Sequence, residues 1–238
     1  MGWCIVALAG LAVLAGGGES KLLAAPGIIP NALRHTGYHV SPDADMNLDG
    51  NGGLMAMTPY GTTLMTDGPD GRGLDFNSDQ DFIDTGAINQ HDQYMNLFFG
   101  YFSAPEAGDY EFSIHHADDR CGIWLDLDQD GVFEAPGGVR TGENIAWYPV
   151  THAPPPMDNV ATVALEESTY MFAATHGEYA GNAFLDVYFM TPSMSSSVII
   201  KPSDAGQDGM WTTVPEPATL SLLAIGGLSL LRKRRRRA

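Results

Sequence analysis

The chain is poor in the residues on which most enzyme and metal signatures depend. It has two cysteines in 238 residues. Cys4 lies in an apolar run near the N-terminus; if that run is removed as a signal peptide, the mature chain keeps only Cys121 and forms no internal disulfide. The sequence also lacks a Gly-x-Ser-x-Gly turn, a His-Glu-x-x-His helix, a phosphate-binding glycine loop and the Cys/His spacing of zinc sites. We therefore predict a protein that is not an enzyme.

Basic residues are equally scarce, and this excludes another class of function. Between Leu22 and Thr213 the sequence has 27 Asp and Glu but only five Lys and Arg. Of the other basic residues, Lys21 precedes this segment and six follow Leu231. A surface this acidic repels nucleic acid and anionic lipid. We predict no nucleic-acid partner. Acidic surfaces suit a compartment rich in divalent cations, although they also serve solubility alone. Acid pairs are too numerous for a glycosidase dyad to stand out.

Long apolar stripes with a helical period are missing from the middle of the chain. Short alternating runs bounded by Gly, Pro, Asp and Asn recur instead, and the 28 Gly and 15 Pro follow no period. This pattern predicts an all-β fold, an antiparallel β-sandwich of the jelly-roll type. The expected strands are Tyr94–Phe102, Tyr110–His116, Gly122–Leu127, Val160–Leu165, Tyr170–Ala174 and Ala183–Met190.

Both ends of the chain have the composition of targeting segments. The apolar run Cys4–Ala15, followed by three glycines, predicts a signal peptide over residues 1–25, although no basic residue precedes the run. At the other end, an apolar run of 14 residues, Ala218–Leu231, precedes a basic cluster. The run is shorter than the roughly 17 to 25 residues of an ordinary spanning helix, and the basic cluster favours a cytoplasmic end. We expect a short C-terminal transmembrane helix.

The order of Pro215-Glu216-Pro217, apolar run and basic cluster resembles the PEP-CTERM sorting signal of biofilm-forming Gram-negative bacteria. An ordinary tail anchor is the alternative. The resemblance implies residence in the inner membrane before processing by an exosortase-type membrane protease. It also implies a final location in the cell envelope, at the surface or in the extracellular matrix.

The remaining sequence predicts one domain with its own core. We place a β-sandwich domain at residues 35–192, a polar linker at 193–213 and the sorting signal at 214–238. The stretch Gly37–Asp84 shows little strand pattern, so its fold stays open.

The segment Phe98–Phe189 resembles the lectin-like β-sandwich of the anthrax protective-antigen type (the PA-fourteen family). The resemblance rests on Gly108-Asp109-Tyr110-Glu111-Phe112, on Asp118-Asp119 at a strand end, on Ile123-Trp124-Leu125-Asp126 and on Gly181–Tyr188. It implies a glycan-binding or adhesive role. In its sugar-binding members, two consecutive Asp residues joined by a cis peptide hold a Ca²⁺ ion that contacts sugar hydroxyls. The resemblance therefore implies a calcium site at Asp118 and Asp119, with Asn144 and Asn182 as further candidates; the alternative is a solvated turn.

Two other segments have the spacing of calcium loops. Asp126, Asp128 and Asp130 with Gly131, and Asp45, Asn47 and Asp49 with Gly50, place oxygen ligands at positions 1, 3 and 5 and glycine at 6. Both lack the Glu of position 12. The alternative for the first is a strand that presents Asp126 and Asp128 outward before a turn at Asp130-Gly131. The alternative for the second is an Asn/Gly-rich turn.

Aromatic side chains are candidates for stacking on a sugar ring. We predict ligand contacts from Trp124, Trp147 and Asn182, although aromatic residues more often lie in a core. The combined prediction is a secreted carbohydrate-binding or adhesion module that binds an extracellular glycan or exopolysaccharide, with Ca²⁺ as its cofactor. The alternative is a structural matrix protein that bridges polysaccharide through divalent cations without a dedicated sugar pocket.

Overall fold

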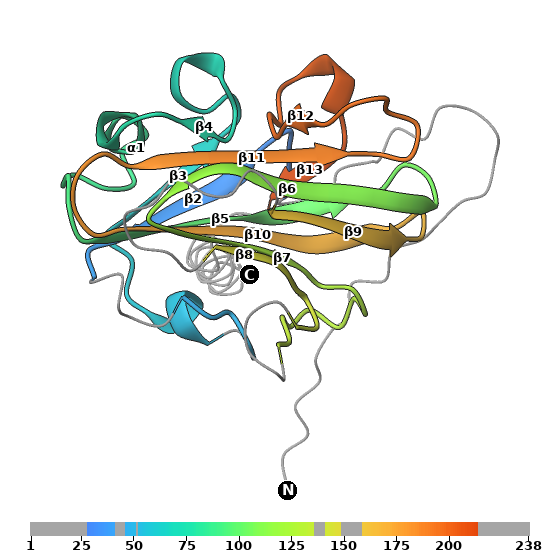
Figure 1. The fold of residues 1–238 in the computed structure, drawn as a ribbon, viewed down its shortest axis with the longest axis horizontal. Helices are drawn as coiled ribbons and strands as arrows, with labels where there is room; N and C mark the ends of the chain where they lie inside the picture. Colours follow the sequence, from blue (N-terminus) through green and yellow to red (C-terminus); the bar gives the residue numbers. More distant parts are fainter. Residues whose placement is uncertain (1–27, 41–45, 51, 136–140, 149–158, 214–238) are drawn as a thin grey trace, which may run out of the picture.

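The computed structural model describes residues 28–40, 46–50, 52–135, 141–148 and 159–213. In these residues, two antiparallel sheets pack face to face (Figure 1), and helix is confined to one short α-helix and three single turns of 3₁₀-helix. The predicted all-β sandwich is confirmed. The six expected strands are all present, each within a few residues of its expected bounds.

The larger sheet has eight strands. Its main path is β1 (Ile29–Pro30), β13 (Trp211–Thr213), β5 (Tyr94–Ser103), β10 (Thr169–Glu178), β7 (Arg120–Leu125) and β8 (Asn144–Tyr148). Strand β2 (Leu33–Tyr38) also pairs with β5, and β3 (Gly61–Met65) pairs with β2. The stretch that showed little strand pattern therefore completes this sheet.

The smaller sheet has five strands and carries the helical elements at its margin. Its path is β12 (Val198–Ile199), β11 (Phe184–Met190), β6 (Gly108–Asp118) and β9 (Asn159–Leu165), and β4 (Asp75–Phe76) pairs with β11. Beside it lie α1 (Asp79–Asp84), η2 (Pro69–Gly71) and η3 (Ala205–Gln207), whereas η1 (Gly53–Ala56) follows β2 on the other side of the molecule (Figure 1).

The core lies between the two sheets, because alternate residues of each strand point inward. Phe98 and Phe102 from β5, Phe112 from β6 and Phe172 from β10 are fully buried there. Cys121, the cysteine of the predicted mature chain, is buried in the same core.

A second apolar cluster covers the outer face of the larger sheet. It contains Met95, Leu97 and Phe99 from β5, Trp124 from β7 and Trp147 from β8. Residues outside the sheets pack over these strands, among them Met46, Leu48 and Phe133 from loops and Leu54 from η1. Both faces of β5 are therefore buried, which explains why its sequence is apolar almost throughout instead of alternating.

The predicted linker at residues 193–213 is wrong, because these residues belong to the sandwich. They form β12, η3 and β13, and Ile200 and Trp211 are fully buried in the core. The Trp211 ring centroid lies 4.9 Å from that of Phe102 and 5.3 Å from that of Phe189. The folded unit therefore extends from Ile29 to Thr213 rather than from residue 35 to residue 192.

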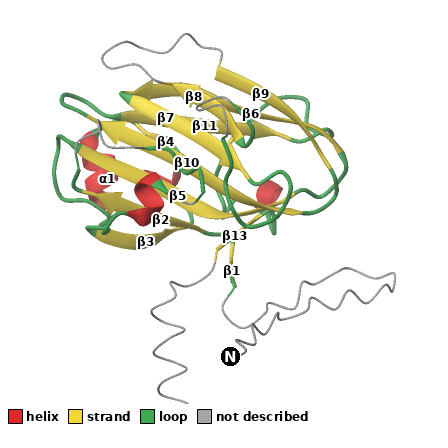
Figure 2. Cartoon of the chain, turned by 90° about the horizontal axis from the view of Figure 1, so that it is seen from below, coloured by secondary structure: helices red, strands yellow, loops and turns green. Residues whose placement is uncertain are grey.

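The two ends of the folded unit lie side by side. Ile29 pairs with Thr213 and Pro30 with Thr212, so the chain enters and leaves at one place (Figure 2). The predicted signal peptide (1–25) and sorting signal (214–238) lie outside the described residues. No helix among the residues described is both long enough and apolar enough to cross a membrane.

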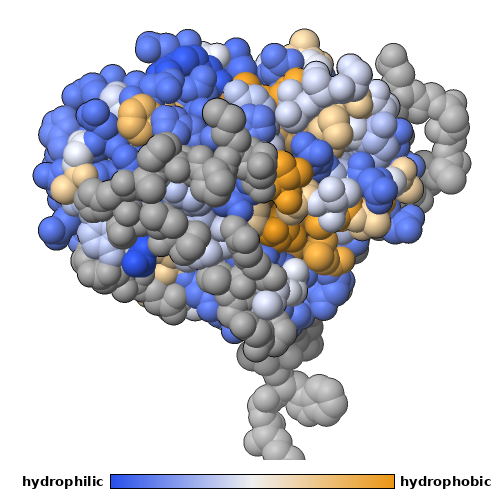
Figure 3. Space-filling model, in the orientation of Figure 1, coloured by the Kyte–Doolittle hydropathy of each residue, from blue (hydrophilic) through white to orange (hydrophobic). Residues whose placement is uncertain are grey.

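Few large hydrophobic side chains of the described residues are exposed. Figure 3 shows one face, which is largely hydrophilic but has an apolar area to the right of its centre. Among the described residues, the exposed large hydrophobic side chains are Tyr60, Leu64, Leu127 and Val160. Leu127 was expected to continue a strand, but β7 ends at Leu125 and the chain turns into a loop at Asp126.

Candidate functional site

The candidate site lies where β6 passes into β7 at one end of the sandwich. Asp118 is the last residue of β6, Asp119 follows it, and the peptide bond between them is cis. It is the cis bond found among the described residues, and it occurs where the resemblance to the protective-antigen type implied one. Asp118 is half-buried and Asp119 is 1% exposed.

The end of β10 holds Asp119 in place. The Asp119 backbone N–H donates to the Gly177 carbonyl at 3.1 Å, and the Asp119 carboxylate Oδ2 accepts from the Tyr179 N–H at 2.7 Å. Two bonds to residues that flank Glu178 therefore fix where the Asp119 carboxylate points. They also bring Glu178 into the site.

Glu178 is the most unusual residue of the site. It is the last residue of β10, its side chain is 0% exposed, and neither of its carboxylate oxygens has a hydrogen-bond partner. Burial, followed by the charges of Asp119, Asp79 and Asp118, raises the pKa of Glu178 to about 9. A buried carboxylate without partners costs free energy, so this position favours a cation or a proton.

A third buried carboxylate approaches from the helix. Asp79 opens α1 after the N-cap Ser78, whose hydroxyl accepts from the Asp81 N–H. The Tyr94 hydroxyl donates to Asp79 Oδ1 at 2.9 Å. Burial raises the pKa of Asp79, and the bond from Tyr94 only partly offsets this effect. The site thus gathers acidic side chains from α1, from β6, from β10 and from Asp119, which joins β6 to β7.

A buried chain of polar side chains leads from the site into the core. The Asp118 carbonyl can only accept, so His176 Nε2 donates to it at 2.8 Å. His176 Nδ1 must then accept from Asn96 Nδ2 at 3.1 Å, while Asn96 Oδ1 accepts from His35 Nε2 at 2.9 Å. Burial lowers the pKa of both His35 and His176 to about 4. Both rings are therefore neutral at physiological pH and act as fixed supports.

The residues present fit a hard divalent cation. Carboxylate oxygens are the ligands that Ca²⁺ takes in proteins, and it requires six to eight oxygens in all. Glu178 supplies two oxygens with no other partner. Asp119 bonds to the residues on either side of Glu178, and the charges of Asp118 and Asp119 both act on it. Asp118 is exposed enough to leave part of such a site open to a ligand.

The other predicted metal residues lie at the far end of β7. Asp126, Asp128 and Asp130 follow Leu125, and one oxygen of each carboxylate lies within 4.8 Å of the others. The six residues of β7 separate Asp119 from Asp126, so the two lie about 23 Å apart at the rise of a strand. The residues predicted as metal ligands therefore form two separate groups.

The structure does not support the predicted sugar-stacking residues. Trp124 is 0% exposed and Trp147 is nearly buried, since both pack in the cluster that the loops cover. Neither offers a free ring face. Asn144 is also buried, and it pairs with Trp124 at the end of β7 remote from Asp119. Asn182 is exposed in the loop after β10, where the neighbouring Gly181 N–H donates to Asp92 Oδ1 at 3.3 Å.

Sequence reasoning missed His176 and Glu178 in this site. The expected strand ended at Ala174 because Thr-His-Gly-Glu is polar, whereas β10 continues to Glu178. The sequence did contain an indication, because alternate residues of a strand share one face. Phe172 and Ala174 point into the core, so His176 and Glu178, which follow at the same spacing, also point into the sandwich.

Comparisons with known proteins concern the C-terminus and the fold. The PEP-CTERM protein-sorting motif matches residues 213–237. No curated protein sequence matches the chain.

The fold is similar to that of solved sugar-binding adhesin domains. The A domain of epithelial adhesin 9 from Candida glabrata, solved with Galβ1-3GlcNAc, is 16% identical with a TM-score of 0.53, over 82% of this chain and 94% of that one. The A domain of epithelial adhesin 6 from the same organism, also with Galβ1-3GlcNAc, is 14% identical with a TM-score of 0.52, over 82% and 90%. The PA14 domain of the antifreeze protein MpAFP is 13% identical with a TM-score of 0.51, over 81% and 95%. The chain therefore combines a β-sandwich with the fold of PA14 domains, the protective-antigen type, and a C-terminal PEP-CTERM protein-sorting motif.

Proposed function

We propose that this chain is an exported, non-catalytic carbohydrate-binding module whose ligand site is the cis Asp118-Asp119 end of the sandwich. The observation that carries the proposal is Glu178, a fully buried carboxylate without partners directly beside that cis bond. A bound Ca²⁺ ion would neutralise this charge and offer its remaining coordination positions to sugar hydroxyls. Asp118, Asp119 and Glu178 are the proposed ligands.

The sorting motif supports the proposed destination. A PEP-CTERM motif at residues 213–237 fits processing by an exosortase-type membrane protease at Pro215-Glu216-Pro217 and delivery to the cell envelope or surface. At that location the ligand available to the protein would be an extracellular glycan or exopolysaccharide. Because the similar adhesin domains were solved with galactosides, galactose-containing glycans are the first ligands to test.

The test is a glycan array with the full chain in calcium and in chelator. The unchanged protein is expected to bind a subset of glycans in calcium only. Asp119→Asn and Glu178→Gln each remove one negative charge at nearly constant shape, and each is expected to weaken binding at least tenfold. Asp109→Asn, an exposed carboxylate at the start of β6, is the matched control and should bind normally.

Glycan binding that persists in chelator would reject the calcium dependence. The alternative function, a structural matrix protein, predicts a different outcome: calcium-dependent association with polysaccharide that survives both substitutions and shows no preference among glycans. That result would show that the acidic surface as a whole, rather than this site, makes the contact.

A further inference from the structure

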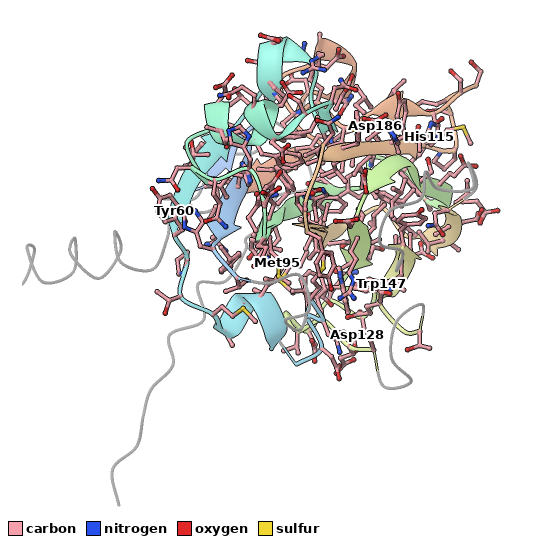
Figure 4. The ribbon with its side chains drawn as sticks, turned by 60° about the vertical axis from the view of Figure 1, so that its left-hand side comes forward. Tyr60, Met95, His115, Asp128, Trp147 and Asp186 are labelled. Atoms are coloured by element: carbon pink, nitrogen blue, oxygen red, sulfur yellow. The ribbon has the colours of Figure 1, made fainter. Side chains whose placement is uncertain are left out.

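The loop that joins β7 to β8 carries a second group of carboxylates. One oxygen of each of Asp126, Asp128 and Asp130 lies within 4.8 Å of the others. None of the three has an ion-pair partner in the part of the chain described. Figure 4 shows Asp128 on the same side of the molecule as Trp147, with His115 and Asp186 of the smaller sheet on the other side.

Asp126 distinguishes this group from an ordinary acidic turn. It is 2% exposed, and its Oδ1 atom has no hydrogen-bond partner, whereas Oδ2 accepts from the Gly131 N–H at 2.9 Å. A solvated turn would leave Asp126 in water. Instead the fold buries a carboxylate against two others and leaves one oxygen unsatisfied, which is costly unless a cation binds there.

The loop is already shaped for this role. Glu143, itself buried, accepts backbone N–H groups from Leu127, from Asp128 at 3.2 Å and from Glu134 at 3.0 Å, and so ties the two sides of the loop together. Its oxygens are therefore used by the backbone and are not counted as ligands. Gly131 has φ of 87°, the left-handed conformation that glycine adopts freely at the sixth position of such loops.

The same loop also contacts the segment of residues 46–50, and together the two cover the outer apolar cluster. The Gly50 N–H donates to the Phe133 carbonyl at 2.7 Å, and the Ala135 N–H donates to Asp49 Oδ1 at 2.8 Å. The two segments that sequence spacing marked as separate calcium loops thus meet, and the Asp49 carboxylate makes the contact between them. Asp45 of the second predicted loop lies outside the described residues. Phe133, Met46 and Leu48 pack in the cluster directly beside this contact.

We propose that Asp126, Asp128 and Asp130 bind a divalent cation, Ca²⁺ by its oxygen ligands, and that this ion fastens the β7–β8 loop and the segment of residues 46–50 over the outer face of the larger sheet. The site is distinct from the one at Asp118-Asp119, since β7 lies between them. The proposed role of the ion is to order the two segments that cover the outer apolar cluster, and not to contact sugar.

The test is calcium titration calorimetry of the chelator-treated full chain. The unchanged protein is expected to bind one ion that is lost in Asp128→Asn, whose side chain is exposed and whose substitution leaves the core intact. Affinity at this site should fall at least tenfold, while Asp109→Asn is without effect. The variant Asp119→Asn should retain the ion, which separates this proposal from the proposed sugar site.

Hydrogen exchange gives a second, local measurement. In the unchanged protein and in Asp119→Asn, calcium should slow exchange at the Gly50 and Ala135 amides at least tenfold, and in Asp128→Asn it should not. If the protein binds no calcium beyond that lost in Asp119→Asn, or if Asp128→Asn and Asp130→Asn leave the stoichiometry unchanged, the proposal is overturned. Calcium binding without protection of these two amides would overturn the fastening role.

Discussion

At the scale of single side chains, the distinctive feature of this sandwich is a row of buried, hydrogen-bonded polar residues. His35, Asn96 and His176 form a line of hydrogen bonds inside the core, and the line ends on the carbonyl of the cis Asp118. Each ring also stacks on a phenylalanine, His35 on Phe98 at 4.3 Å between centroids and His176 on Phe82 at 4.6 Å. The candidate site is therefore positioned from within the core.

Replacing His35 with Phe should change how stability depends on pH. The folded-state pKa of about 4 lies below the ordinary value of 6.5, so between these values the unfolded chain binds more protons at this position. The free energy of unfolding therefore falls as pH drops from 6.5 to 4. One such histidine contributes a slope of up to about 1.4 kcal/mol per pH unit.

The measurement is urea unfolding of the unchanged chain and His35→Phe at several pH values. The phenylalanine keeps the stacking surface but cannot take up a proton, so the variant should lose this part of the slope and retain the part due to His176. Its stability at neutral pH is expected to be lower, because Asn96 loses a partner. Identical slopes for both proteins would contradict the assignment of the pKa.

At the scale of elements, the alternation of apolar residues predicted the central strands and failed at the margins. Strands β5, β6 and β11 carry strong patterns because they cover the core from end to end. Strand β2 was missed because its buried residues include His35, Thr36 and Gly37, which form hydrogen bonds or allow a close approach. A Cβ on Gly37 would lie 2.2 Å from the Ala87 carbonyl oxygen.

The last strand was missed for a different reason. Strand β13 has three residues and follows a segment rich in Ser, Asp and Gly, so no period is long enough to read. Trp211 is the one residue that indicates this strand, and the burial of Trp211 depends on β1, β5 and β11, which are distant in sequence. The candidate site was limited in the same way. The resemblance predicted the position of Asp118 and Asp119, but Glu178 could be placed beside them only once the pairing of β10 was known.

A fragment of residues 28–192 should fail to fold as a stable unit. It lacks Ile200 and Trp211, and removal of a buried tryptophan side chain alone costs about 3 to 5 kcal/mol. That loss is comparable with the total stability of many domains. A fragment of residues 28–213 is the control and should unfold cooperatively on heating. Equal melting temperatures for the two fragments would show that β12 and β13 contribute little.

At the scale of the whole molecule, charge is the dominant feature. The sequence between Leu22 and Thr213 carries 27 acidic and five basic residues, and the ion pairs found among the described residues are those of Arg72 with Asp75 and Asp81. Such a molecule repels itself in the folded state, and both salt and bound cations relieve this repulsion.

The melting temperature in chelator should therefore rise as sodium chloride is added. Screening at about 0.1 M salt already shortens the reach of exposed charges to about 10 Å. Saturating calcium should raise the melting temperature further, because an ion held at about a hundred times its dissociation constant adds about 2.7 kcal/mol per site. The salt dependence should also be smaller in calcium than in chelator. A melting temperature that is constant or falls with salt would contradict the role of repulsion.

The position of Thr213 limits how far the folded unit can lie from the sorting motif. Thr213 is fully buried in β13, and Pro215 follows two residues later. Because a chain spans at most about 3.6 Å per residue, the folded unit and Pro217 are at most about 14 Å apart. Attachment through the proposed sorting tail would therefore hold the sandwich directly on the membrane, with no stalk, where it could contact only a matrix that reaches to within about one domain of the lipid.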